Sequence, residues 1–103
     1  GPWSPTAVPP APTVPGLWAR PNPFSRQLAL GFATTLAGAV SLEIFGVDGR
    51  RVRTLMSGRT EPGEHRRVWD GRNDAGAAVG PGLFFGRLVT PDGRFTRRLI
   101  YVR

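Results

Sequence analysis

The sequence has 103 residues, which is enough for one domain but not for two domains with separate cores. Its 14 glycines and 11 prolines favour a turn-rich β protein, and the absence of cysteine excludes disulfides, a thiolate nucleophile and a cysteine zinc site. All 14 basic residues are arginines, and the net charge is +7. Such a charge is typical of proteins that bind nucleic acids or acidic surfaces, but arginine in place of every lysine is also typical of a GC-rich genome.

Residues 1–20 are rich in proline and are predicted to form an extended spacer of the polyproline II type, joining the folded part to a preceding domain. Gly1 and Pro2 are typical of a protease-site remnant left by an expression vector. The sequence shows no signal peptide and no stretch of the length of a membrane span. Trp3 and Trp18 interrupt the spacer, and we expect Trp18 to dock onto the folded domain, which is predicted to span residues 21–103.

From residue 22 onward, short alternating runs of apolar and polar residues are separated by turn signals, which predicts β-strands. The strongest hairpin signal is Asp48-Gly49, because glycine tolerates the positive φ of a tight turn. The predicted strands span residues 28–33, 40–47, 50–56 and 64–69, a short piece around Val79, and residues 83–90 and 94–102. Short strands at this spacing, with no helical period, predict an antiparallel sandwich.

The strand predicted at residues 50–56 indicates which side chains face the core. Val52 and Leu55 are core candidates, whereas Arg51 and Arg53 are expected to face water. Other adjacent arginines occur at residues 66–67 and 97–98. Since neighbours in a strand point to opposite faces, these pairs do not form a continuous phosphate-binding track, and we predict no nucleic-acid partner.

Aromatic side chains are the candidates for contact with a sugar ligand. Trp69 stands at a strand end before a loop, and we expect it to fill the core between the sheets. Phe84 and Phe85 are adjacent in a strand, so one ring is expected to be buried and the other partly exposed. Together with Trp18 and Tyr101, these two phenylalanines are the candidate ligand-contact residues, although their spacing does not demand a shared surface.

The residues that catalysis or metal binding requires are few and have simpler explanations. His65, the only histidine, lies in a predicted strand and is expected to be structural. Most acidic residues lie in turns, where their side chains bond the backbone. Residues 70–76 resemble a calcium loop, but Arg72 occupies the third ligand position, so we expect a tight hydrogen-bonded loop. We therefore predict no catalytic residue, no cofactor and no metal.

Six motifs occur in an order and spacing that resemble one family. They are Arg20-Pro21-Asn22-Pro23-Phe24; residues 44–55 around Asp48-Gly49; Gly63-Glu64-His65; Trp69-Asp70-Gly71 with Gly76; Gly82-Leu83-Phe84-Phe85; and the closing residues 97–103. Over residues 20–103 they resemble the FlgD-type immunoglobulin-like domain, which is closely similar to the C-terminal sorting domains of the type IX secretion system. The chain departs from that pattern at Arg67, where an apolar residue is common, so its stem is expected to pack while its charge faces outward.

The resemblance implies a seven-stranded, fibronectin III-like sandwich with a non-catalytic role in export or surface anchoring. The larger protein would be a secreted or cell-surface protein of a Gram-negative bacterium. The implied partners are a catalytic domain, reached through the Pro-rich linker, and the secretion or anchoring machinery. Arg97, Arg98 and Arg103 are the candidate recognition residues near the C-terminus. Two alternatives stay open: a carbohydrate-binding module of a secreted polysaccharide-degrading enzyme, and a scaffold in flagellar hook assembly.

Overall fold

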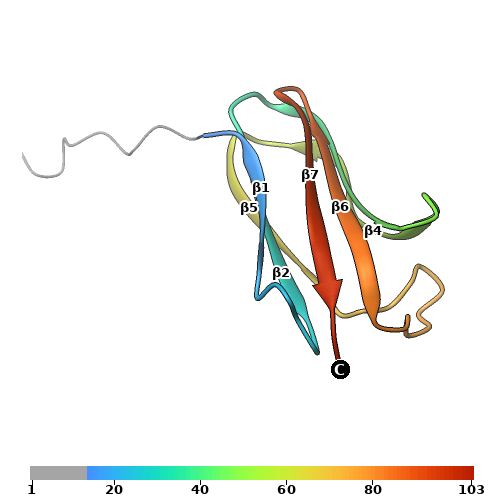
Figure 1. Cartoon of the computed structure of the whole chain (residues 1–103). Coiled ribbons are helices and arrows are strands. Elements are labelled where there is room, and N and C mark those ends of the chain that lie inside the picture. The colour runs from blue at the N-terminus through green and yellow to red at the C-terminus, as the bar shows by residue number, and fades with distance from the viewer. Residues whose placement is uncertain (1–13) are drawn as a thin grey trace, which may run out of the picture.

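A computed structural model of the chain describes residues 14–103, so the expectations for Trp3 and for residues 1–13 lie outside the described residues. Two antiparallel sheets pack face to face, which confirms the predicted all-β, seven-stranded immunoglobulin-like sandwich (Figure 1). The strands are β1 (Gly16–Arg20), β2 (Leu28–Thr34), β3 (Gly38–Gly46), β4 (Arg51–Thr60), β5 (Gly63–Trp69), β6 (Gly82–Thr90) and β7 (Gly93–Tyr101). One sheet has the order β1-β2-β5 and the other β4-β3-β6-β7. No helix in residues 14–103 is long and apolar enough to cross a membrane.

The set of seven strands differs from the predicted set at two places. The piece around Val79 is not a strand, because only an isolated bridge between Arg72 and Ala78 forms there. Instead, Gly16–Arg20 forms β1, which pairs with β2 along its whole length, so the sandwich includes residues that we assigned to the linker. Proline flanks β1 without entering it, and Leu17 is fully buried, which explains why a strand forms inside a Pro-rich region.

Alternate residues of both sheets point inward and form one core. Trp69 is fully buried, as predicted, and Phe84 is the buried member of the adjacent phenylalanine pair, whereas Phe85 is partly exposed. The remaining members are aliphatic and aromatic side chains of β1, β2, β3, β6 and β7 and of the segment before β2: Leu17, Phe24, Leu28, Leu30, Phe32, Val40, Leu42, Ile44, Leu88 and Leu99.

Strand β4 contains two irregularities in its pairing with β3, and these change the direction of one side chain. Val52 and Leu55 pack partly against the core, as expected. Arg51 faces outward, as expected, and lies 3.4 Å from the Glu43 carboxylate. The expectation for Arg53 is wrong: it is paired with the inward-facing Ile44, and its Nη1 lies 3.4 Å from the carbonyl oxygen of Arg72. A residue inserted into a strand shifts the alternation of side chains, so counting every second residue no longer gives the direction of the side chains beyond it.

Two arginines bridge the seams along which the two sheets meet. Arg67, at the β5 edge, donates from Nη1 to the Arg66 carbonyl (2.7 Å), and its Nη2 lies 3.0 Å from the Met56 sulfur on β4. Arg97 on β7 donates from Nε to the Leu17 carbonyl on β1 (2.6 Å). The edges of a sandwich expose unpaired backbone groups, and these guanidinium groups satisfy some of them.

Candidate functional site

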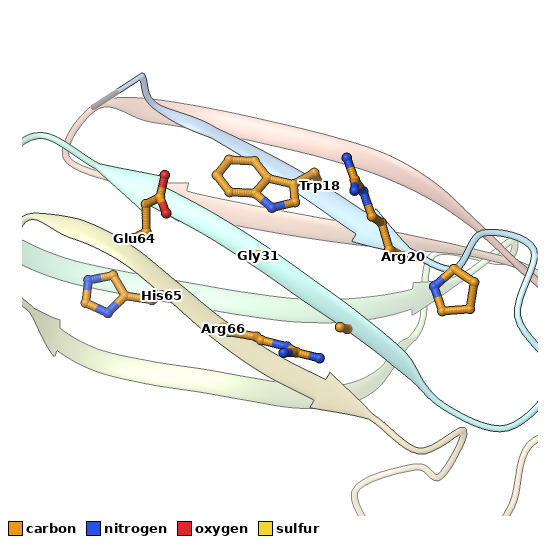
Figure 2. A pocket seen from close by; sticks show the side chains of 8 residues that line it. Trp18, Arg20, Gly31, Glu64, His65 and Arg66 are labelled. Atoms are coloured by element: carbon orange, nitrogen blue, oxygen red, sulfur yellow. The ribbon is translucent and has the colours of Figure 1, made fainter. Parts of the chain in front are cut away.

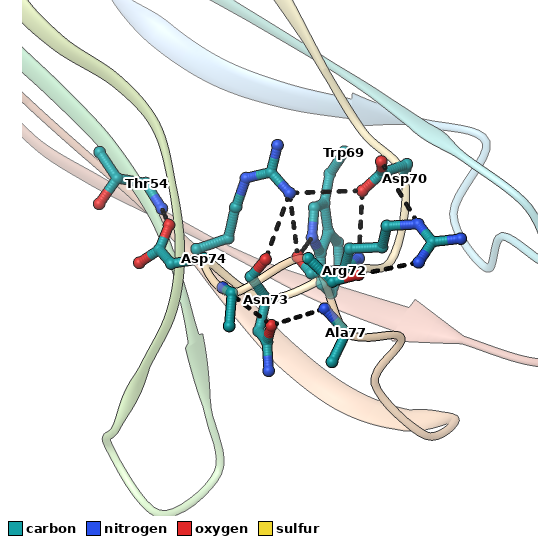
Figure 3. A network of polar contacts seen from close by, with 10 residues as sticks. Thr54, Trp69, Asp70, Arg72, Asn73, Asp74 and Ala77 are labelled. Atoms are coloured by element: carbon teal, nitrogen blue, oxygen red, sulfur yellow. Dashed lines mark hydrogen bonds and ion pairs between the residues drawn. The ribbon is translucent and has the colours of Figure 1, made fainter.

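The loop after β5 is organised around Trp69 (Figure 3). The indole Nε1–H donates to the Arg72 carbonyl (2.9 Å), and the ring meets Phe84 edge to face, with centroids 5.1 Å apart. The Asp70 carboxylate accepts the backbone N–H of Arg72 (3.1 Å), and Arg72 Nη1 donates to the Gly76 carbonyl (2.8 Å). The buried indole therefore fixes the start of the loop to the core.

Asn73 closes the same loop through its side chain. Its Oδ1 accepts the backbone N–H groups of Ala75 (3.0 Å) and Ala77 (2.9 Å), and the backbone N–H of Asn73 donates to the Ala77 carbonyl (2.9 Å). These bonds confirm the predicted tight hydrogen-bonded loop. Within residues 14–103, no three histidine or acidic side chains gather in a way that could hold a metal ion.

Asp74 attaches the loop to the free edge of β4. Its backbone N–H donates to the Val52 carbonyl (2.9 Å), and its Oδ1 accepts the backbone N–H of Thr54 (2.9 Å). The other carboxylate oxygen lies 3.6 Å from Arg51 Nε. The loop thus acts as a partial extra strand, which protects this edge from pairing with another chain.

Phe24 joins the segment after β1 to the last strand. Its N–H donates to the Ile100 carbonyl (2.9 Å), and its carbonyl accepts the N–H of Val102 (2.8 Å), so the bridge to Tyr101 is parallel. The Phe24 ring is buried between Trp69, at 5.5 Å, and Tyr101, on which it stacks at 4.9 Å. The chain therefore crosses from the β1 sheet to the β7 sheet at this point.

Asn22 strengthens the same junction with its side chain. Its Nδ2 donates to the Arg98 carbonyl (2.7 Å), and its Oδ1 accepts the N–H of Ile100 (2.9 Å). A side-chain amide carries one donor group and one acceptor, so it can imitate a peptide unit of a neighbouring strand. The Asn-Pro-Phe motif of the sequence is thus a clamp on β7.

Asp92 connects two turns at one end of the sandwich. Its carboxylate accepts the Oγ1–H (2.5 Å) and the backbone N–H (2.6 Å) of Thr35 and the Oγ1–H of Thr34 (3.0 Å). The bond from the Thr35 hydroxyl, followed by that from its N–H, lowers the pKa of Asp92, because both favour the charged carboxylate. This acid therefore has a structural role.

His65 also has structural partners. Its Nε2 lies 2.8 Å from the Glu61 carbonyl oxygen, and its ring stacks on buried Phe32 with centroids 5.2 Å apart. It lies on the inward-facing row of β5, at the sandwich edge, which agrees with the structural role expected for it.

The outer face of the three-stranded sheet carries a shallow groove of about 780 Å³ (Figure 2). Trp18 of β1 lies across β2 at one side, and Glu64 and Arg66 of β5 lie at the other. Arg20, at the end of β1, lines the groove beside Trp18. Trp18 is 40% exposed, so its docking onto the sheet, which we predicted, leaves part of the ring in solvent.

The model of the FlgD immunoglobulin-like domain family matches residues 25–85, which is more than half of the chain. The chain belongs to the FlgD immunoglobulin-like family. The match confirms the resemblance inferred from the motifs. The matched region includes the Trp69 loop and most of the sandwich.

A region of the solved structure of dimeric latent PorU from Porphyromonas gingivalis has the same fold as this FlgD immunoglobulin-like domain. The TM-score is 0.69 at 23% sequence identity, and the match covers 89% of this chain but 10% of the PorU chain. The domain thus spans about a tenth of the length of that protein, and at this identity the likeness concerns the fold alone. No curated protein is significantly similar to the sequence.

The four aromatic ligand-contact candidates do not gather on one surface of the FlgD immunoglobulin-like domain. Phe84 is buried against Trp69, with 9% of the residue exposed, so most of its ring packs in the core. Tyr101 is partly buried and stacks on Phe24. Trp18 and Phe85 lie on the outer faces of different sheets. Alternation identifies the two faces of a strand, but it does not show which strands share a sheet.

The three candidate recognition arginines of the FlgD immunoglobulin-like domain differ in their contacts. Arg97 holds the β1–β7 seam through its bond to the Leu17 carbonyl, which gives it a structural role. Arg98 and Arg103 are exposed, and Arg98 is paired with Phe85 on the outer face of its sheet.

The charged part of the groove was not among the predicted sites. Arg20, Glu64 and Arg66 come from two strands that are not adjacent in the sequence or in the sheet, with β2 between them. The only available signal was that Arg20 is two residues from Trp18, which places both on the same face if the segment is a strand. The Pro-rich composition concealed that strand.

Proposed function

We propose that this FlgD immunoglobulin-like domain is a non-catalytic accessory module that serves the export or surface anchoring of a larger secreted or surface-attached bacterial protein. The observation that carries the proposal is the family match over residues 25–85, since the family consists of non-catalytic domains. The similarity of its motifs to type IX sorting domains supports export as the specific role.

The roles of the titratable side chains support the non-catalytic part of the proposal. A general acid or base must reach a substrate, but Asp92 is engaged by two threonines and Asp74 by the β4 edge. His65 is held between the Glu61 carbonyl and Phe32. These three titratable side chains thus stabilise turns and edges of the sandwich.

The outward-facing arginines of the C-terminal region support the export part. Arg98 and Arg103 are exposed, and the Asn22 clamp holds the backbone that carries Arg98. Arg98 lies on β7, and a receptor can bind a charge on a fixed strand with little loss of conformational entropy. Deleting the last strand is a poor test of this idea, because it would also remove fully buried Leu99 and unfold the domain.

The test is a fluorescent protein that is directed to the periplasm and carries this chain at its C-terminus, in a bacterium with a type IX secretion system. We expect the fusion to reach the medium or the cell surface, and Arg98→Glu with Arg103→Glu to retain it in the periplasm. The matched control is Arg26→Glu with Arg94→Glu, which makes the same charge change at two other exposed arginines. Periplasmic retention of the unchanged, folded fusion would overturn the export role, and equal loss in both double variants would overturn the recognition role of Arg98 and Arg103.

A further inference from the structure

Two glycines leave room for the Trp18 indole to pack on the outer face of the three-stranded sheet. Gly31 of β2 is paired with Trp18, and a Cβ at Gly31 would overlap Nε1 of the indole. A Cβ at Gly16 would lie 3.7 Å from the six-membered part of the ring, in ordinary contact. The absence of a side chain at Gly31 is therefore what allows the ring to lie against the backbone of β2, as Figure 2 shows.

Shielding of Gly31 explains why one face of the indole packs on the sheet. It does not explain which residues surround the exposed part of the ring. An aromatic ring placed over a glycine stabilises the sheet, and any aromatic neighbour could do so. The Trp18 side chain is nevertheless left 40% exposed, beside a groove lined by Arg20, Arg66 and Glu64. An exposed ring edged by charged side chains offers both a stacking surface and directional hydrogen bonds.

The charged residues of the groove stand apart from the ion pairs of the domain. Arg50, Arg51, Arg53, Arg59 and Arg72 each lie within 4.0 Å of a carboxylate. Among the contacts of residues 14–103, Arg20, Arg66 and Glu64 form no such pair, although Arg66 and Glu64 lie on the same face of β5. Their hydrogen-bonding groups are thus free to engage a ligand in the groove.

We propose that this groove binds an acidic polysaccharide, with one sugar ring stacked on Trp18 and its carboxylate bound by Arg66 or Arg20. A guanidinium group matches the geometry of a carboxylate and can donate two parallel hydrogen bonds to it. Glu64 supplies an acceptor for sugar hydroxyl groups. Neighbouring strands are about 4.8 Å apart, so the three strands give a contact about 10 Å wide, which accommodates a short stretch of a polysaccharide chain.

The same groove is poorly suited to single-stranded nucleic acid. Proteins that bind single strands combine a continuous positive track with several stacking rings. Beside the Trp18 indole, the groove is lined by one other aromatic residue, the half-buried His65, and the Glu64 carboxylate would repel the phosphates of a bound strand. An acidic sugar also offers hydroxyl groups that can donate to the Glu64 carboxylate, so it fits this mixture of charges better than a chain of phosphates.

The test is a titration of the whole chain with tetragalacturonic acid at physiological ionic strength, followed by NMR shifts of the Trp18 indole N–H. The fully methyl-esterified tetramer and a tetranucleotide are the comparison ligands. We expect the acid to shift the Trp18 resonance and to bind at least tenfold more tightly than either comparison ligand. Tighter binding of the tetranucleotide, or no shift with the acid, would overturn the proposal.

Three variants separate the groove from the overall charge. Arg66→Gln removes one guanidinium group, and Gly31→Ala displaces the indole without changing any charge. Arg94→Gln is the matched control, because Arg94 is exposed on the other sheet. We expect Arg66→Gln to weaken binding about tenfold and Arg94→Gln to leave it unchanged; equal weakening by both would overturn the site. Melting curves establish that the variants are folded. Failure of the acid to bind leaves the export proposal untouched, because that proposal concerns Arg98 and Arg103 rather than the groove.

Discussion

Replacing Trp69 with alanine tests whether the loop and the core depend on one side chain. The indole is fully buried, meets Phe84 and Phe24 at centroid distances of 5.1 and 5.5 Å, and donates to the Arg72 carbonyl. Truncation would leave a large cavity between the sheets and remove a hydrogen-bond donor from the loop. Changes of this kind lower the free energy of unfolding by about 3–5 kcal/mol.

This loss is large for a domain of this size. At about 0.05–0.15 kcal/mol per residue, some 90 ordered residues give a free energy of unfolding of about 5–13 kcal/mol. Each kcal/mol corresponds to a change of about 4–8 °C in the melting temperature of such a domain. Trp69→Ala is therefore expected to lower the melting temperature by at least about 12 °C.

Urea unfolding, followed by far-ultraviolet circular dichroism, measures the change without relying on tryptophan fluorescence. Trp69→Phe keeps an aromatic ring but lacks the Nε1–H, so it separates packing from the bond to Arg72, which is worth about 1 kcal/mol. Trp18→Ala is the matched control, because that side chain is 40% exposed and its loss should cost much less. A change below about 1 kcal/mol for Trp69→Ala would refute the reasoning.

Three further predictions concern the junctions of the sandwich. Asn22→Ala should reduce the free energy of unfolding by about 1–3 kcal/mol and accelerate hydrogen exchange at the Ile100 amide, which loses its acceptor. The bonds from Thr35 lower the pKa of Asp92 in the folded state, so the charged carboxylate stabilises the fold above its ordinary pKa, and this effect is lost as the pH falls through the folded value. Asp92→Asn should therefore lower the melting temperature at pH 7. It should also weaken the pH dependence of the melting temperature below about pH 4. Arg97→Gln should lower stability by about 1 kcal/mol in urea unfolding, because it removes the bond to the β1 carbonyl, whereas Arg97→Lys should recover only part of the loss.

The elements with local signals could be predicted from the sequence. The Asp48-Gly49 turn has Gly49 at a φ of +81°, in the left-handed region that a glycine adopts without strain. Trp69 was predicted as a core residue because it ends an alternating strand before a loop. These features depend on a few neighbouring residues, so their physical causes are visible in the sequence.

The features that were missed depend on residues far apart in the sequence. The Asn22 clamp joins residues 22 and 98, and the seam bond of Arg97 reaches Leu17. Neither the amide of Asn22 nor the guanidinium of Arg97 reveals which backbone carbonyl it will meet. The groove has the same origin, since Arg66 approaches Trp18 only because β2 pairs with both β1 and β5.

The parallel bridge at Phe24 has a mechanical consequence. Figure 1 shows that β1 begins at one end of the sandwich and that β7 finishes at the opposite end. A pull on the two ends of the domain would load the Phe24 bonds to Ile100 and Val102 along the strand direction, so they would have to break together rather than one after another. The domain should therefore resist stretching between these two ends more strongly than a domain whose terminal strands separate one bond at a time.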